Sequence, residues 1–172
     1  MTGYQLRMRN ELERRYNHLR MQSIQMANQA LRTPDVRLSL VDNASYRAFE
    51  QWQNHPNRKV DWNWPTSWHS WKIHYPKRFE CATWQGNKLI GFAMGRPTYQ
   101  ATGLRLDYIE KSPKASEPHL DLTYLALYAY ATLLGATHVK IMSPINKDVR
   151  DYYESKGFKY DQKSDSCIRR II

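Results

Sequence analysis

The chain has 172 residues, the size of one common folding domain, and it is long enough to bury a substantial core. Its hydrophobic share of 41% and mean hydropathy of −0.77 predict a soluble protein. No apolar run approaches the roughly 18 residues that span a bilayer. Residues 1–20 contain no apolar stretch of signal-peptide length. We therefore expect a cytoplasmic protein that makes no membrane contact.

The formal net charge of +10 is the strongest compositional signal. Such a field attracts polyanions, which include nucleic acid, anionic lipid surfaces and phosphorylated small molecules. Many small proteins are basic without binding a polyanion, so both interpretations stay open.

Cysteine and histidine usage argues against a metal centre. The only two cysteines are Cys81 and Cys167, which fit a reducing compartment at least as well as a disulfide. The six histidines are scattered, and no Cys/His spacing is typical of a zinc site. We expect no metal.

The first element in chain order is a long helix from about Tyr4 to Arg32, with apolar residues at helical spacing and no internal Gly or Pro. Thr33-Pro34 ends it. Its most prominent basic residues are Arg7, Arg9, Arg14, Arg15 and Arg20. The sequence predicts a helical extension over 1–34 and a second part over 35–172. The helix is either a solvated surface helix or an arm that binds RNA, DNA or a protein partner.

A second helix is expected from Asp42 or Asn43, as N-cap, to about Asn54. The following stretch, His55 to Pro76, holds four tryptophans and three prolines, so we do not expect it to be one regular element. The tryptophan rings either line a surface that faces the substrate or pack against the side of a small core.

The second half of the chain has a more regular pattern. Strands are expected at 79–84, 88–94, 104–110, 138–142 and from 158 onward, with another candidate at 167–172. Residues 85–87 form a hairpin turn, and Gly95 to Pro97 should break the second strand. Helices are expected at 120–134, with Gly135 as C-cap, and at 148–156. This order predicts an α/β domain with a mixed sheet and helices packed on it.

Three segments carry a resemblance to a known family. They are the strand-turn-strand Cys81–Ala93 with its Leu-Ile-Gly-Phe-Ala ending, the strand end Tyr108–Pro113, and Asn146–Phe158 with its Tyr-Tyr pair and Lys-Gly-Phe. Together they resemble the Gcn5-related N-acetyltransferase (GNAT) superfamily, over about half of the chain. The resemblance implies a GNAT-like fold: a mixed, mostly antiparallel central sheet flanked by helices, here with an added long N-terminal helix. It also implies transfer of an acetyl or related acyl group from acetyl-coenzyme A to a primary amine.

The expected coenzyme loop departs from the family pattern. The family has an Arg/Gln-x-x-Gly-x-Gly/Ala loop whose backbone N–H groups hold the pyrophosphate. Here Ala115–Leu120 contains no glycine, Pro118 has no N–H, and Glu117 would repel a phosphate. Either side chains replace the backbone grip, or coenzyme binding is lost. By resemblance, the coenzyme contacts are assigned to Tyr108, Ile109, Lys111, Lys114, Ser116, His119, Leu120, Asn146 and Tyr152.

The same resemblance implies catalytic roles. Because amine pKa values lie near 10.4, a base must remove a proton, and Asp107 and Glu110 are the local carboxylates. The two side chains should point to opposite faces of their strand, so at most one of them can act as the base. The alternative role for each is that of a salt-bridge partner. Tyr153 matches the family's proton donor to the leaving thiolate, although a packed ring explains it equally. A backbone N–H near Ile109 would stabilise the oxyanion.

The identity of the acceptor amine is open. The basic surface favours an amine borne by nucleic acid or an acidic protein over a cationic antibiotic or polyamine. One rival hypothesis is a non-catalytic nucleic-acid-binding protein on the same scaffold, which uses the first helix and the Trp-rich stretch. Another is an interaction module that forms a homodimer through the long helix.

Overall fold

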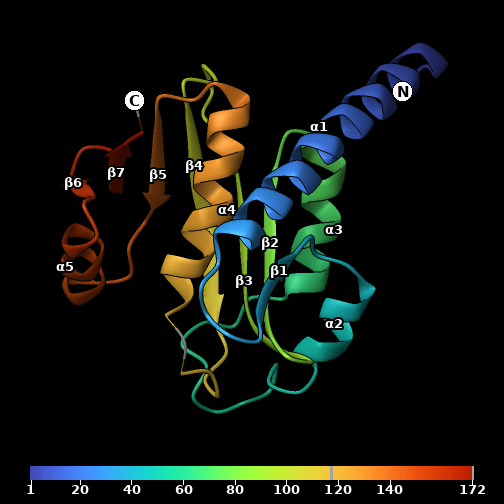
Figure 1. The fold of residues 1–172 in the computed structure, drawn as a ribbon. Helices are drawn as coiled ribbons and strands as arrows, with labels where there is room; N and C mark the ends of the chain where they lie inside the picture. Colours follow the sequence, from blue (N-terminus) through green and yellow to red (C-terminus); the bar gives the residue numbers. More distant parts are fainter. Residues whose placement is uncertain (117, 172) are drawn as a thin grey trace.

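The computed structural model describes residues 1–116 and 118–171. Its centre is a seven-stranded sheet in the order β1-β2-β3-β4-β5-β7-β6 (Figure 1). The strands are β1 (Val36–Ser39), β2 (Phe79–Gln85), β3 (Lys88–Pro97), β4 (Gly103–Lys111), β5 (His138–Met142), β6 (Lys159–Asp161) and β7 (Ser166–Arg170). Neighbouring strands are antiparallel except β4 and β5, which are parallel. The predicted mixed, mostly antiparallel sheet is confirmed.

Helices cover both faces of the sheet. They are α1 (Gly3–Ala30), α2 (Asn43–Phe49), α3 (Trp64–His74), α4 (His119–Leu134) and α5 (Lys147–Ser155). One hydrophobic cluster joins α1, α4 and the ring of Tyr153 on α5 to one face. A second, mostly aromatic cluster joins α2 and α3 to the other face. Figure 1 shows α1 and α4 lying side by side against the sheet. No described helix is both long and apolar enough to cross a bilayer.

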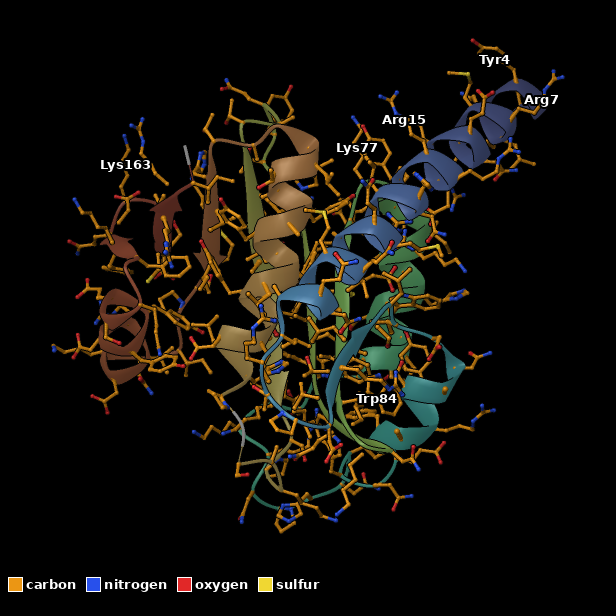
Figure 2. All side chains as sticks on the ribbon, in the orientation of Figure 1. Tyr4, Arg7, Arg15, Lys77, Trp84 and Lys163 are labelled. Atoms are coloured by element: carbon orange, nitrogen blue, oxygen red, sulfur yellow. The ribbon has the colours of Figure 1, made fainter. Side chains whose placement is uncertain are left out.

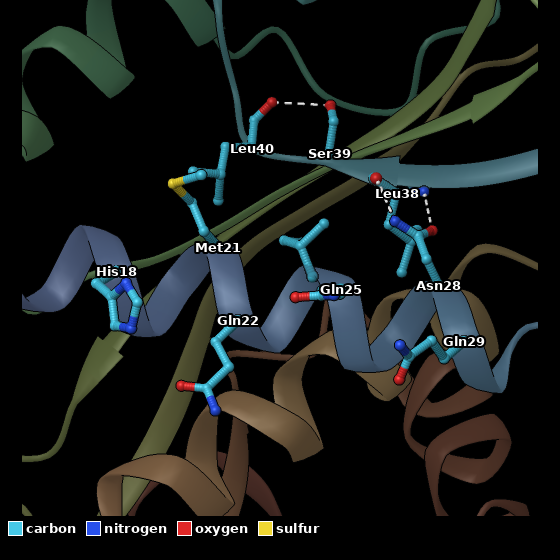
Figure 3. A pocket seen from close by; sticks show the side chains of 10 residues that line it. His18, Met21, Gln22, Gln25, Asn28, Gln29, Leu38, Ser39 and Leu40 are labelled. Carbon is cyan, nitrogen blue, oxygen red and sulfur yellow. Dashed lines mark hydrogen bonds between the residues drawn. The ribbon is translucent and has the colours of Figure 1, made fainter.

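The predicted N-terminal helix is present, and its two halves differ. The first half projects away from the body (Figure 1), and Tyr4 and Leu6 are exposed on it. The second half is anchored. Asn28 pairs through its amide with both backbone groups of Leu38 on the edge strand β1, at 2.8 and 2.9 Å (Figure 3). This pairing covers one point of the sheet edge.

A buried ionic network also holds α1 in place. Arg20 is only 1% exposed and donates to Glu13 at 2.6 Å and to the carbonyl of Pro76 at 2.8 Å. Arg78 bonds Glu13 and Glu80, so two guanidinium groups share two carboxylates. The sequence counted Arg20 among the basic residues of a mostly solvated helix, but it lies in the core, because carboxylates compensate its charge.

Two elements were not anticipated, and one expectation was wrong. Residues 55–76 do not form one regular element, as expected, but they contain a helix, α3: Asn63 caps it, and Pro65 lies in the first turn, where its missing N–H costs nothing. Strand β1 was not anticipated, because four residues are too few to show alternation. Strand β3 does not break at Gly95 but continues to Pro97 through an irregularity in its pairing with β4.

Half of the six tryptophans are buried, and the other half are partly buried around them. Trp64 is 1% exposed and Trp52 is 3% exposed, and both belong to the aromatic cluster under α2 and α3. Trp62 and Trp71 are half-buried and contact the ring of Tyr108 edge-on, at centroid distances of 4.9 and 5.7 Å. The tryptophans therefore pack the α2/α3 face, and Trp62 and Trp71 border β4.

Candidate active site

The sheet opens in its middle, between the two parallel strands. β4 pairs with β5 only from Gly103 to Leu106 and then continues to Lys111 with β3 as its only recorded partner. The pairing of β4 with β3 also shifts here: Tyr108 faces Met94 while Leu106 faces Gly95, which leaves Asp107 as an extra residue. Such a bulge bends a strand and redirects its side chains. Half of β4 therefore presents one edge to the gap beside β5.

Backbone donors line this edge of β4. The N–H of Ser112 donates to the carbonyl of Ile90 on β3 at 2.9 Å. Donors alternate between the two sides along a strand, so Glu110 also faces β3, while the N–H groups of Ile109 and Lys111 face the opening. An N–H held in place without a strand partner can stabilise negative charge on an oxygen. This geometry agrees with the donor expected near Ile109.

The N-terminus of α4 lies at the end of the loop that follows β4. Pro118 occupies the N-cap position, and none of the side chains that the structure describes caps the helix. Asp121 does not fill that role, because it pairs with Lys156 of α5 at 3.1 Å. The first-turn N–H groups, including that of Leu120, are consequently free to attract an anion. Lys111, Lys114 and Ser116 are exposed along the same segment. Glu117 lies outside the described residues.

His119 points away from the loop. Its ring is 5% exposed, and its Nε2 lies 3.2 Å from the carbonyl oxygen of Phe92. A Cβ at Gly91 would lie 2.6 Å from Nε2 of His119 and 2.7 Å from the carbonyl of Glu110, so only glycine allows this packing. Burial lowers the pKa of His119 to about 4. The neutral, inward ring cannot replace the missing loop glycines in contacting a phosphate.

Glu110 is fully engaged within the core. It is 6% exposed and accepts from Arg58 at 2.7 and 3.0 Å and from the indole N–H of Trp64 at 2.5 Å. These bonds fix the segment before α3 onto β4. Both carboxylate oxygens are occupied by protein donors and neither is left to contact an amine, so the geometry favours the salt-bridge role for Glu110.

Asp107 is buried but only partly satisfied. Its side chain is 10% exposed, and Oδ1 accepts from Arg105 Nε at 2.8 Å. Oδ2 has no hydrogen-bond partner among the described residues. Burial raises the pKa of Asp107, although Arg105 and Arg96 oppose the shift. Asp107 is therefore the carboxylate of β4 that has a free oxygen and a raised proton affinity, and it lies at the bulge.

Asn146 and Tyr152 lie on the α5 side of the opening. The side chain of Asn146 caps α5 by accepting from the N–H of Val149 at 3.0 Å. Tyr152 is 40% exposed, and the ammonium of Lys156 lies 5.5 Å from its ring centroid. The side-chain oxygen of Asn146 is thus used to cap the helix, while the side chains of Tyr152 and Lys156 are accessible.

Tyr153 packs into the core as a ring. It is 8% exposed, contacts Phe158 and Tyr152, and burial raises its pKa to about 12. A thiol has an ordinary pKa of about 8.5, so proton transfer from this phenol to a thiolate is uphill by roughly 5 kcal/mol. The packing role explains Tyr153 better than the role of proton donor.

Arg58, Arg96 and Arg105 are the site-forming residues that sequence reasoning missed. Arg58 sits in a segment without periodicity and pairs with a carboxylate 52 residues away, so no local signal identifies it. Arg105 lies in the predicted strand two residues before Asp107, and this same-face spacing could have indicated their pairing. Gly95 inside a strand pattern could have indicated the bulge.

Comparison with known proteins identifies the fold. No protein family matches the sequence, and no curated protein matches it significantly. Among solved structures, the chain is similar to Ard1 from Thermoplasma volcanium (TM-score 0.60, 11% identity, 80% of this chain and 99% of that one). It is also similar to a probable acetyltransferase from Staphylococcus epidermidis (TM-score 0.61, 9% identity, 80% of this chain and 99% of that one). A third neighbour is FdhC, described as a nucleotide-linked sugar GNAT (TM-score 0.57, 12% identity, 79% of this chain and 86% of that one).

At these identities the likeness establishes the fold alone. The chain has the GNAT fold, and the predicted resemblance is confirmed at that level. The described residues contain no group of three or more His, Cys, Asp or Glu side chains placed to hold a metal ion.

Proposed function

We propose that this protein is an N-acetyltransferase that moves an acetyl or related acyl group from coenzyme A to a primary amine. One observation carries the proposal. The parallel strands β4 and β5 part after Leu106, and the uncapped N-terminus of α4 follows the same half of β4. Together they offer an extended slot with backbone donors along it and an anion site at its end.

The residues around the slot fit a coenzyme with an altered phosphate grip. The first turn of α4 supplies N–H groups, and Lys111 supplies positive charge. Lys114 and Ser116 were also predicted as contacts, but they line a cavity on the other side of β4, where the ammonium of Lys114 donates to the carbonyl of Gln51. These groups replace the glycine-rich loop of the family. When bound, acetyl-coenzyme A would supply an acyl group activated as a thioester. Tyr108, Asn146 and Tyr152 stay as predicted contacts.

Asp107 is the proposed base. A protonated amine must lose a proton before it attacks, and a buried carboxylate with a raised pKa and a free oxygen can accept it. The N–H of Ile109 holds the oxygen that gains charge. Glu110 positions β4 through Arg58 and Trp64 and takes no proton in this scheme.

The proposed acceptor is an amine carried by a polyanion, such as RNA, DNA or an acidic protein. The net charge of +10 supports this class, because it attracts polyanions and repels cationic amines. Figure 2 shows Arg7 on the projecting end of α1, with Arg15 and Lys77 closer to the body. Arg15 and Lys77 both approach the ring of Tyr16. This basic ridge would bind the polymer that carries the amine.

Calorimetric titration with acetyl-coenzyme A tests the first requirement. We expect binding that weakens at least threefold in Lys111→Glu, because the charge reversal faces the phosphates. The matched control Lys159→Glu, on the edge strand β6, should keep the wild-type affinity. Absence of binding at millimolar acetyl-coenzyme A by the folded protein would refute the proposal. Thiol release with a panel of amines on tRNA, DNA and peptides then identifies the acceptor.

A further inference from the structure

A second cavity lies beside the loop after β4, away from the β4–β5 opening. Its volume is about 560 Å³, within the range of small-molecule sites. It is bounded by the end of α2, the hairpin between β2 and β3, and the loop 112–116. The residues that matter for its chemistry are Arg47, Gln51, Trp52, Lys88, Lys114 and Ser116. The hairpin is on the side of β4 opposite to β5, so this cavity is distinct from the proposed coenzyme slot.

The cavity carries uncompensated positive charge. Arg47, Lys88 and Lys114 come from three different segments, and the lining residues that the structure describes include no Asp or Glu. None of the three forms a salt bridge with any acidic residue that the structure describes. Asp35 lines a separate hollow that also contains Lys88, and the two side chains form no salt bridge there. Converging cations without a counter-charge attract an anionic ligand.

The frame of the cavity is rigid. Trp52 is 3% exposed, and its indole N–H donates to the carbonyl of Leu89 at 3.0 Å. Ser112 is 2% exposed, is tied to β3, and accepts from the N–H of Lys114 at 3.2 Å. The ammonium of Lys114 reaches across to the carbonyl of Gln51 at 3.3 Å. The walls are therefore formed before any ligand arrives, which lowers the entropy lost on binding.

We propose that this cavity binds a phosphate-bearing small molecule of mononucleotide size, independently of the coenzyme slot. Arg47, Lys88 and Lys114 neutralise the phosphates, and the amide of Gln51 and the hydroxyl of Ser116 lie within the same lining. The groove between α1 and β1, shown in Figure 3, is larger at about 970 Å³ but has no such charge. Nothing in the structure indicates what occupies that groove.

Calorimetry with ADP, inorganic pyrophosphate and adenosine tests the site. We expect both phosphorylated probes to bind and adenosine not to bind. The double variant Arg47→Ala/Lys88→Ala should bind ADP about tenfold more weakly, since each exposed ion pair contributes up to about 1 kcal/mol. Lys159→Ala/Lys163→Ala removes the same charge at the opposite edge and should bind like the wild type. The proposal is overturned if ADP does not bind, or if both double variants weaken it equally.

A competition experiment tests independence from the coenzyme. Acetyl-4′-phosphopantetheine fills the proposed slot without offering a nucleotide. At a saturating concentration of this compound we expect an unchanged affinity for ADP, and Arg47→Ala/Lys88→Ala should keep wild-type affinity for the compound. Mutual displacement would mean one shared site and would overturn the inference. Because the compound's own binding is measured separately, failure of the coenzyme proposal is distinguishable from failure of this one.

Discussion

Glu110 and Asp107 leave the same strand three residues apart and have opposite environments. Glu110 accepts three hydrogen bonds from Arg58 and Trp64, so its buried charge is fully compensated. Asp107 is almost as buried, yet only Oδ1 is bonded, and Arg96 Nε beside it also lacks a partner among the described residues. The strand therefore carries one carboxylate that serves the fold and one with an unused oxygen.

The contrast gives a rule for assigning roles at this site. A buried polar group that is fully bonded contributes to stability and is costly to remove. A buried polar group that is left partly unbonded lowers the stability of the fold, and it retains the capacity to take a proton or bind a ligand. The predictions below test whether the described buried groups of this site divide in this way.

The largest expected effect is on stability, from Glu110→Ala. The change leaves the guanidinium of Arg58 and the indole N–H of Trp64 buried without their acceptor. We expect the free energy of unfolding to fall by about 4 kcal/mol. Urea denaturation followed by tryptophan fluorescence measures it.

Asp151→Ala is the matched control, because Asp151 is exposed and Lys147 is its only ion-pair partner among the described residues. It should change the free energy of unfolding by less than about 0.5 kcal/mol. Equal effects of the two substitutions would show that the contacts of Glu110 do not stabilise the fold, and the comparison with Asp107 would lose its basis.

His119 extends the comparison to a buried base. Its folded pKa is lowered to about 4 by burial, below the unfolded value near 6.5. Below pH 6.5 the unfolded chain takes up a proton that the folded chain refuses, so stability falls as the pH drops from about 6.5 to 4. The loss attributable to this ring is about 3 kcal/mol.

Urea denaturation at a series of pH values, with His119→Gln for comparison, isolates the contribution of His119. The variant should lose this part of the pH dependence, whereas His69→Gln, on the exposed side of α3, should retain it. If the wild type and His119→Gln have parallel profiles, the ring is not held neutral in the folded state.

The sequence predicted the second half of the fold better than the first. Residues 138–142 were expected as a strand and form β5 with those bounds, because a short segment with alternating burial between a capped helix end and a turn has few alternatives. Gly135 caps α4 in the left-handed conformation, as expected. β1 and α3 were missed. Their formation depends on pairing with β2 and on packing against β3 and β4, which short segments do not reveal.

The site was predicted less well than the fold, for a physical reason. Alternation placed Asp107 and Glu110 on opposite faces of β4, but the bulge at Asp107 breaks that alternation. Which backbone groups of β4 face the opening follows from where its pairing with β5 ends, and this is a property of the assembled sheet. The roles of Arg58 and Arg96 depend on contacts between segments far apart in the chain. Local pattern contains none of this information.

Asp107→Asn should affect turnover rather than folding. The amide keeps the shape and the bond to Arg105 but cannot take a proton, so we expect kcat to fall about 100-fold with any amine that supports thiol release. The raised pKa of Asp107 predicts that kcat/KM rises with pH through that pKa as the carboxylate ionises, and that this limb is absent in the variant. Steady-state thiol release across pH measures both quantities.

Asp61→Asn, at an exposed position in the segment before α3, is the control and should leave the profile unchanged. An Asp107→Asn variant with wild-type turnover would mean that the unbonded oxygen is a packing defect without chemical use. The base would then have to be a water molecule or a group of the acceptor itself.

The smallest effect is expected from Tyr153→Phe, and it separates a packed ring from a proton donor. The ring is 8% exposed and packs against Phe158, and its pKa of about 12 makes the hydroxyl a weak acid toward a thiolate. We expect kcat to change by less than about threefold, within the range of one neutral hydrogen bond. Tyr99→Phe, on a fully exposed ring, serves as the control. A fall of 100-fold or more in Tyr153→Phe alone would restore the role that the family resemblance implied, and it would show that a ring packed in the core can still act as an acid here.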